Sequence, residues 1–348
     1  MLSKNNLNIP LDKFINLCLY DKRNGYYMKK NPFGKEGDFI TAPNLSRLFS
    51  EMIAIWIIGF WENLGSPKKF NLIELGAGNG VMMKILIESF EKFPNFFKSC
   101  NIIIHETSPR LIEIQKKELK YDKISWISEI EKIKKIPTIF VANEFFDSIA
   151  IKQFIKKNNV WFERYVNLNN KKKPFFFDKK FNMQKFEKKI SYNISKNQNF
   201  IEYSVNGLKY LKKIAKIINK NNGGLLIIDY GYTEKKMKNT LKAISKHEYS
   251  NIFQKIGNSD ITHNINFYLL KQIVNKSGGL SSILTTQGDF LINMGIKRRA
   301  ETIAQNKSFL KKANIYFRLK KLIDKKHMGN IFKVMFIKKL QNNYRAGF

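Results

Sequence analysis

An apolar strand pattern that runs into three closely spaced glycines constrains the fold of this chain more than any other feature. Residues 71–75 read Asn-Leu-Ile-Glu-Leu, and Gly76, Gly78 and Gly80 precede an apolar helical pattern over 81–90. Glycine is needed where a tight turn requires unusual φ/ψ values and where the backbone approaches a ligand closely. A strand that ends in such a turn before a helix N-terminus is typical of a nucleotide-like ligand site. The alternative is a glycine-rich loop that only connects a strand to a helix.

The spacing of the glycines argues against a nicotinamide dinucleotide. The dinucleotide fingerprint is G-x-G-x-x-G, whereas here the third glycine comes one residue early and Val81 takes the expected position. With Glu74 in front, the pattern E-x-G-x-G-x-G resembles motif I of class I S-adenosylmethionine-dependent methyltransferases. A nicotinamide oxidoreductase is therefore the least favoured enzyme class.

The basic residues do not by themselves indicate a nucleic-acid-binding protein. The 348 residues carry a formal net charge of +34, which would suit a polyanion. The lysines, however, are spread along the whole chain, and no RNA-binding aromatic motif or zinc finger accompanies them. We expect a solvated surface and no specific nucleic-acid partner, with a polyanion-binding face as the alternative.

Cysteine usage and apolar segments favour a globular protein of a reducing compartment. Cys18 and Cys100 lie far apart and the four histidines are scattered, so neither a disulfide framework nor a metal site is predicted. The most apolar segment, 52–61, is far shorter than the ~20 residues of a membrane span, and we expect it to form a fully buried helix. The first residues contain no long apolar run, so we expect no secretory signal and a cytoplasmic, bacterial-type protein.

Beyond the glycine turn, apolar strand patterns alternate with helical ones. Strands are predicted at 101–106, 123–127, 137–142 and 225–228, and helices at 109–119 and 204–219. This alternation predicts an α/β fold with a mostly parallel sheet and right-handed crossovers. Residues 1–66 are expected to be a helical extension packed on the core, which spans 67–348.

Two stretches interrupt the alternation and are interpreted as insertions that cover a site, at about 155–203 and 232–279. In the first, 160–166 and 174–177 are expected to form a hairpin around 169–171, which either makes a homodimer contact or closes the cleft.

Acidic residues at strand ends are the candidate ligand contacts. Glu106 ends the second predicted strand, where an acid binds ribose hydroxyls in nucleotide-binding folds. Glu74 is expected to receive the positively charged amino group of a methionine moiety, directly or through water. The alternative for both residues is a solvated carboxylate at a strand end.

The run 143–147, Asn-Glu-Phe-Phe-Asp, follows another predicted strand and should face the same crevice as the glycines. Two carboxylates beside two aromatic rings suit a cationic substrate, because carboxylates grip a guanidinium through charge-assisted hydrogen bonds and aromatic faces attract it. The alternative is a helix-capping acid next to core phenylalanines. The polar clusters at 259–263 and 287–291 are expected to be caps or turns.

Several segments occur in an order that resembles the MidA-like methyltransferase family, and the resemblance covers about 11–338. They are 37–43, 74–80, 106–109, 143–147, 228–231, 260–262, 287–290 and 328–333. The resemblance implies a class I (Rossmann-like) methyltransferase with a seven-stranded, mostly parallel sheet, helices on both faces and S-adenosyl-L-methionine as cofactor. It also implies methylation of an arginine on a protein, as mitochondrial members do on a subunit of respiratory complex I.

The resemblance assigns roles to eight residues. By this resemblance, the cofactor contacts are Glu74, Gly76, Gly78, Gly80 and Glu106. The residues on the substrate side are Asn143, Glu144 and Asp147. Relatives usually have histidine at position 143, so the role of Asn143 is the least supported. Two alternatives to the arginine methyltransferase are a partner-binding assembly factor with little or no catalysis, which the retained glycines and acids argue against, and an RNA methyltransferase.

Overall fold

The computed structural model describes residues 7–29, 41–169, 173–245 and 248–348. Most of the family-like segment 37–43 and the centre of the predicted turn at 169–171 therefore lie outside the described residues.

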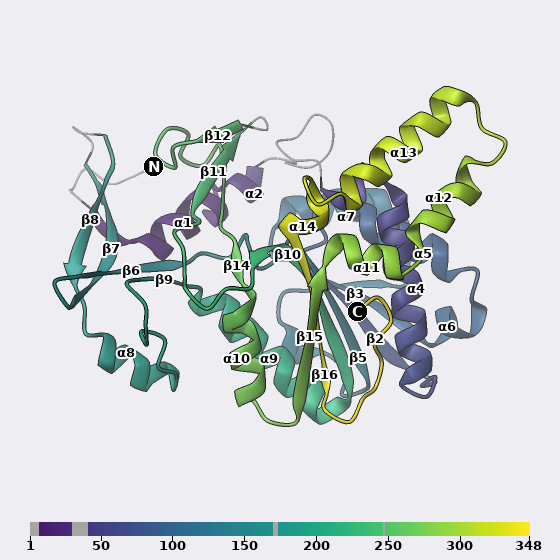
Figure 1. Cartoon of the computed structure of the whole chain (residues 1–348), viewed down its shortest axis with the longest axis horizontal. Helices are drawn as coiled ribbons and strands as arrows, with labels where there is room; N and C mark the ends of the chain where they lie inside the picture. Colours follow the sequence, from purple (N-terminus) through teal and green to yellow (C-terminus); the bar gives the residue numbers. More distant parts are fainter. Residues whose placement is uncertain (1–6, 30–40, 170–172, 246–247) are drawn as a thin grey trace.

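The centre of the fold is a mixed sheet whose long path has seven strands (Figure 1). Their order is β15 (Leu280–Thr286), β16 (Phe332–Lys339), β10 (Gly223–Tyr232), β5 (Thr138–Asn143), β2 (Phe70–Leu75), β3 (Cys100–His105) and β4 (Ile124–Ile127). The last five run parallel, whereas β16 is antiparallel to both of its neighbours. A short strand, β14 (Ile265–Asn266), pairs with β10 beside this path. The predicted α/β fold is confirmed, and the sheet is mixed.

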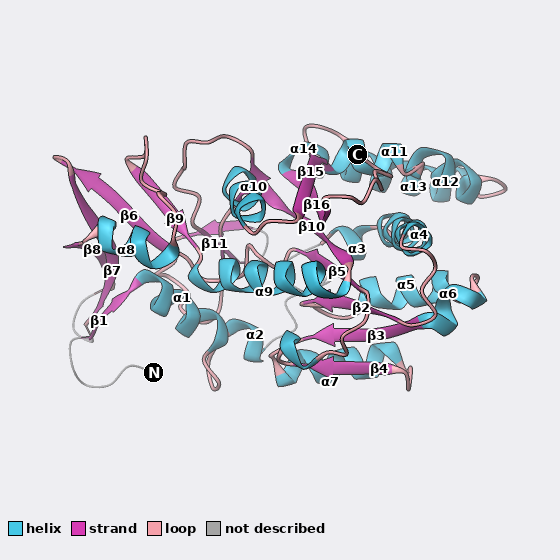
Figure 2. Cartoon of the chain, turned by 90° about the horizontal axis from the view of Figure 1, so that it is seen from below, coloured by secondary structure: helices cyan, strands magenta, loops and turns pink. Residues whose placement is uncertain are grey.

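Two hydrophobic cores lie on opposite faces of this sheet, because alternate residues of a strand point to opposite sides. Along β2, Leu72 belongs to one core and Ile73 to the other. The first core includes α4 (Arg47–Asn63) and α5 (Val81–Phe90), and the second includes α9 (Val205–Asn221) and α10 (Phe267–Lys276). Figure 2 shows these layers from below.

Helices begin where capping residues predict them. The Ser108 hydroxyl accepts a hydrogen bond from the Leu111 amide at 3.2 Å and caps α7 (Pro109–Leu119). The apolar segment 52–61 lies in α4, but the expectation that it is fully buried is wrong at Ile55, which is 43% exposed. The reason is that α4 packs against α5 and the sheet, while the stripe that contains Ile55 faces away from them.

The first predicted insertion forms a second sheet, at the end of the molecule that carries β6 to β8 in Figure 1. It contains β6 (Lys152–Lys157), β7 (Val160–Leu168), β8 (Phe175–Lys180), β9 (Phe200–Tyr203) and also β1 (Leu7–Pro10). β7 and β8 pair antiparallel, as the predicted hairpin requires. The pairing of β1 with β7 was not predicted, because nothing local in residues 7–10 indicates so distant a partner. Helix α8 (Met183–Ile190) connects β8 to β9, and α9 follows β9.

The second predicted insertion contributes a three-stranded sheet of β11 (Lys242–Ser245), β12 (Glu248–Ser250) and β13 (Asp260–Thr262). Its last part, α10, belongs to a core of the main sheet. At the N-terminal side, α1 (Leu11–Tyr20) and α2 (Tyr26–Lys29) approach this region, and residues of α1 share a third core with β13. The three-stranded sheet and α1 thus lie beyond the carboxyl ends of the main strands.

Between β15 and β16 the chain is helical. The elements are α11 (Gln287–Asn293), α12 (Ile296–Ala304), α13 (Phe309–Ile323) and α14 (Met328–Ile331). Figure 1 shows α12 and α13 as an arm at the end opposite the second sheet. The short helices α3 (Ala42–Leu45), α6 (Pro94–Ser99) and η1 (Ile130–Lys132) complete the fold. Within the described ranges, no helix is long and apolar enough to cross a membrane.

Candidate functional site

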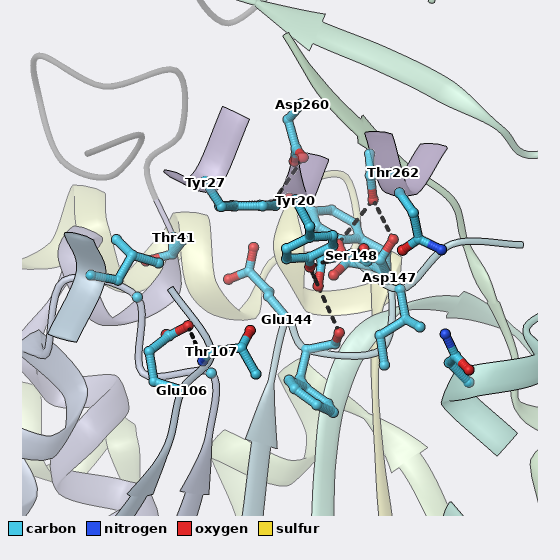
Figure 3. A pocket seen from close by; sticks show the side chains of 18 of the residues that line it. Tyr20, Tyr27, Thr41, Glu106, Thr107, Glu144, Asp147, Ser148, Asp260 and Thr262 are labelled. Atoms are coloured by element: carbon cyan, nitrogen blue, oxygen red, sulfur yellow. Dashed lines mark hydrogen bonds between the residues drawn. The ribbon is translucent and has the colours of Figure 1, made fainter. Parts of the chain in front are cut away.

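A cavity of about 280 Å³ lies at the carboxyl ends of the parallel strands. Strands β2, β3 and β5 each lead into residues that line it, and β10 contributes one from within the strand. These residues are Gly76 and Gly78 after β2, Glu106 and Thr107 after β3, Glu144, Phe145 and Asp147 to Ile149 after β5, and Tyr230 in β10. Figure 3 shows Glu144 near the centre, between Glu106 on one side and Asp147 on the other. Five predicted site residues therefore line one cavity: Gly76, Gly78, Glu106, Glu144 and Asp147.

The glycine turn takes the conformation for which glycine was predicted. Gly76, Gly78 and Gly80 have φ values of +68°, +53° and +83°, which L side chains rarely adopt. A Cβ added at Gly76 would lie 3.0 Å from Cδ2 of Phe145. Gly80 does not belong to the described lining of the cavity; it caps α5, and its missing side chain faces Leu119 of α7. The third glycine thus shapes the turn and the packing between two helices.

Glu106 is held by its own loop and by Gln115. One carboxylate oxygen accepts hydrogen bonds from the amides of Thr107 and Ser108 at 2.8 and 2.9 Å, and the other accepts one from Gln115 Nε2 at 3.2 Å. The same Gln115 nitrogen donates to the Gly78 carbonyl at 2.9 Å. Gln115 therefore ties the glycine turn to the acid at the neighbouring strand end.

Gln115 was not among the predicted site residues, although one signal in the sequence indicates it. It lies on α7, one residue before the Lys116–Lys117 pair, at a position on the apolar side of the helix, where it is fully buried. A buried glutamine needs hydrogen-bond partners, so a glutamine on the apolar side of a helix beside a candidate ligand loop is expected to form hydrogen bonds with that loop.

Glu74 is buried beneath the turn and is not among the described lining residues. Its Oε2 atom has no hydrogen-bond partner in the described part of the chain. Burial, followed by the nearby charge of Glu106, raises the Glu74 pKa to about 8. The alternative of a solvated strand-end carboxylate is therefore excluded, and the site contains an acid that a cation would stabilise in its ionised form.

Glu144 projects into the cavity from a strained position. Its φ is +50°, which is uncommon for a residue other than glycine. Asn143, the last residue of β5, donates to Glu144 Oε1 at 3.3 Å but is not among the described lining residues. Burial and then the charge of Asp147 raise the Glu144 pKa to about 8. The strained backbone and the raised pKa are both typical of functional sites.

Asp147 and the loop before it are fixed from two sides. The Thr262 hydroxyl donates to Asp147 Oδ2 at 3.0 Å. The fully buried Asp229, within β10, accepts hydrogen bonds from the amides of Phe146 and Asp147 at 3.0 and 3.2 Å. Burial raises the pKa of both aspartates. Asp229 thus positions the loop that carries Glu144.

The far side of the cavity is built from tyrosines and a further acid. The Tyr27 hydroxyl donates to Asp260 Oδ1 at 2.9 Å, and the Tyr20 hydroxyl donates to Ser148 Oγ at 3.3 Å. Tyr230 faces the ammonium of Lys242, which lies 5.1 Å from the ring centroid. Aromatic rings and carboxylates therefore surround the end of the cavity beyond Glu144.

The structure corrects the interpretation of the polar cluster at 259–263. Asp260 and Thr262 were expected to serve as a cap or turn, but they lie in β13 and line the cavity. Tyr20 and Tyr27 were not predicted at all. Their partners lie more than a hundred positions away in sequence, so only the tertiary fold brings them to the site. The cluster at 287–291 lies in α11 itself, whose N-terminus is capped by the preceding Thr286: its hydroxyl accepts a hydrogen bond from the Asp289 amide at 3.2 Å.

This fold and this site define an α/β protein with a nucleoside-type ligand site at the carboxyl ends of its strands. The family model described as "Putative S-adenosyl-L-methionine-dependent methyltransferase" matches residues 52–286. The chain belongs to this family of methyltransferases, its cofactor is S-adenosyl-L-methionine, and the resemblance to MidA-like enzymes is confirmed.

Named relatives agree with this family. The chain is 26% identical over 328 residues to the mitochondrial protein arginine methyltransferase NDUFAF7 of Xenopus tropicalis, which covers 86% of this chain and 75% of that protein. For the human protein of the same name the identity is 26% over 323 residues, with coverages of 85% and 72%. A Burkholderia thailandensis protein crystallised with S-adenosyl-homocysteine is similar in fold, with a TM-score of 0.81, 21% identity, and coverage of 98% of this chain and 90% of that one.

The residues present fit this cofactor. Because Gly76 and Gly78 have no side chains, the backbone of the turn is open to a ligand, and their positive φ values favour glycine there. The unpartnered Glu74 oxygen offers an acceptor for an ammonium group. Glu106 supplies a buried carboxylate at the second strand end, whose oxygens retain lone pairs for further donors.

Proposed function

We propose that this methyltransferase acts on the guanidinium group of an arginine in a protein. The observation that carries the proposal is the clustering of Glu144, Asp147 and Asp260 with tyrosine rings in the part of the cavity beyond the glycine turn. Carboxylates bind a guanidinium through paired hydrogen bonds, and aromatic faces attract it.

The proposed cofactor contacts are Glu74, Gly76, Gly78, Gly80 and Glu106. S-adenosyl-L-methionine supplies an activated methyl group when bound. Gly76 and Gly78 would contact it through their backbone, Glu106 would accept hydrogen bonds from its ribose, and Glu74 would receive its ammonium directly or through water. Gly80 would act indirectly, through the shape of the turn.

In the proposed reaction, Glu144 and Asp147 hold the guanidinium so that one nitrogen faces the methyl group. A guanidinium is charged and a weak nucleophile, so the nitrogen must lose a proton as the new bond forms. Glu144 would accept that proton, because a base whose pKa is about 8 is suited to proton transfer near neutral pH. Asn143 would position Glu144 through the hydrogen bond between their side chains.

Replacement of Glu144 by Gln tests the proposal. The variant keeps the size and most hydrogen bonds of the side chain but cannot accept the proton. We expect loss of radiolabelled methyl transfer to protein, with unchanged heat of S-adenosyl-L-methionine binding. Glu129→Gln, at an acid whose side chain is 57% exposed, is the matched control. Normal turnover by Glu144→Gln would refute the assigned role.

The target protein is a separate proposal. By family resemblance, a subunit of respiratory complex I is the first candidate substrate, and a cytoplasmic location remains a prediction. Mass spectrometry of the labelled protein band from a lysate would identify the target and the methylated residue. Label on lysine or in RNA instead of on arginine would contradict the proposed substrate class.

The proposed division of the chain follows from the same site. Residues 67–348 would form the catalytic core, and 1–66 would pack on it as a helical extension. Residues of this extension and of the insertion at about 232–279 would build the substrate side of the cavity, whereas the insertion at about 155–203 contributes none of the described lining residues. Tyr20, Tyr27 and Asp260 support this division, because all three line the cavity from outside the main sheet.

A further inference from the structure

The arm formed by α12 and α13 carries a largely exposed apolar face, at whose edge the Lys321 ammonium lies 4.8 Å from the Phe317 ring centroid. Phe309, Leu310, Tyr316 and Phe317 are 82%, 79%, 44% and 58% exposed. Ala313 is exposed as well. Counted from Phe309, the other four residues follow at one, four, seven and eight positions along the helix. At ~100° per residue these positions form one face of α13. The opposite side, with Leu319 and Leu322, is buried in the main core.

We propose that this face binds the same face of a second copy, so that two α13 helices pack antiparallel about a two-fold axis at Ala313. In an isologous contact, residue i meets residue j of the partner and j meets i. The exposed apolar positions are symmetric about Ala313: Phe309 corresponds to Phe317, and Leu310 to Tyr316. Large side chains thus meet large side chains at both ends, and the small Ala313 at the centre allows the helices to approach closely.

The exposed area is sufficient for such a contact. Large apolar side chains present about 150–250 Å² each. At their observed exposures, the four large side chains correspond to roughly 500 Å² per copy and roughly 1,000 Å² for the pair. This lies at the lower limit for a specific interface, about 1,000 Å². A single exposed apolar residue would need no explanation, whereas a contiguous face of this size does.

The charges around the face predict the salt dependence of the contact. Residues 296–323 contain nine Lys and Arg residues and one acid, Glu301. Two such arms repel each other, and salt screens that repulsion. The dimer should therefore become tighter at higher ionic strength. Binding to an anionic lipid surface or to an acidic protein would weaken under the same change, so the direction of the salt effect separates these occupants.

Sedimentation of the full chain at several concentrations tests the proposal. We expect a species of twice the 40.9 kDa chain mass, whose dissociation constant falls as salt rises. Leu310→Glu should raise that constant at least ten-fold. Leu340→Glu is the matched control, because Leu340 is 64% exposed and lies outside the arm. A wild-type monomer at high protein concentration, or a dimer that Leu310→Glu leaves intact, would overturn the proposal.

A cysteine cross-link tests the register independently of affinity. In the proposed arrangement, the two copies of Ala313 face each other across the axis, so Ala313→Cys should form a disulfide-linked dimer under mild oxidation. Lys311→Cys, on the other side of the helix, should not. The native thiols give little background, since Cys18 is buried and Cys100 is partly buried. Equal cross-linking at both positions would contradict the register. Flotation of a monomer with phosphatidylserine vesicles would assign the face to lipid and overturn the proposal.

Discussion

Replacement of Glu74 by Gln should stabilise the cofactor-free protein at neutral and alkaline pH. Burial raises the Glu74 pKa from 4.5 to about 8, so the folded state favours the protonated acid while the unfolded state ionises at the ordinary value. Below about pH 4.5 the acid is protonated in both states, and there is no penalty. As pH rises towards 8, wild-type stability is lost relative to the variant, because folding must keep a proton that the unfolded chain releases.

The size of this effect follows from the pKa difference. The rise from 4.5 to about 8 corresponds to at most roughly 5 kcal/mol at 1.36 kcal/mol per pH unit. The stability difference between Glu74→Gln and wild type should grow by up to about 1.4 kcal/mol per pH unit between pH 5 and 8 and then level off. A buried glutamine adds a cost of its own, but that cost does not change with pH. The slope is therefore the diagnostic quantity.

Urea unfolding of both proteins at pH 5, 6, 7 and 8 measures this slope, with Glu129→Gln as the exposed control. S-adenosyl-L-methionine should then reverse the order of stability, since its ammonium would stabilise ionised Glu74 and the variant would lack that partner. Parallel stability curves for wild type and Glu74→Gln across this pH range would refute the account of Glu74 as a buried, unpaired acid.

Three further changes test other parts of the site. Gly76→Ala should destabilise the protein by about 1–2 kcal/mol, because an alanine would have to adopt the positive φ of this position. Its Cβ would add strain against Phe145, and denaturant unfolding measures the total loss of stability. Gln115→Ala should remove the hydrogen bonds that link the glycine turn to Glu106 and lower the free energy of unfolding by about 1–3 kcal/mol. Cofactor binding should also weaken in calorimetry; unchanged binding would show that the turn keeps its shape without Gln115. Because Glu144 must be ionised to accept a proton and its pKa is about 8, kcat/KM should increase with pH through that region; a flat profile between pH 6.5 and 9 would contradict its role as base.

Local patterns were sufficient to locate the part of the cavity beside the glycine turn, which we propose holds the cofactor. The backbone conformation of Gly76 and Gly78 favours glycine, and Glu106 directly follows a strand whose apolar run is visible in the sequence. Helix bounds at 81–90 and 109–119 matched because their caps and periodicities involve residues within a few positions. Such signals are local, so they can be recognised in the sequence without knowledge of the fold.

The part of the cavity beyond Glu144, which we propose binds the substrate, could be predicted only in part. The run at 143–147 was recognised because it follows a strand in the same sheet, but Asp260, Tyr20 and Tyr27 reach the cavity through contacts that no local pattern encodes. The roles of Asp229 and Gln115 likewise depend on what lies opposite them. A polar residue at a strand or helix position shows its importance only when its partners are known.

The sequence by itself determined the alternating strands and helices, the conformation of the glycine turn and the acids at the strand ends, because each depends on neighbours along the chain. The tertiary structure alone decided which acids are buried, how far burial and neighbouring charge raise their pKa values, and which tyrosines enclose them. It also decided that one apolar face of α13 packs in the core while the other stays open. Burial and electrostatic coupling depend on residues that are close in space and distant in sequence, so they exist only once the chain has folded.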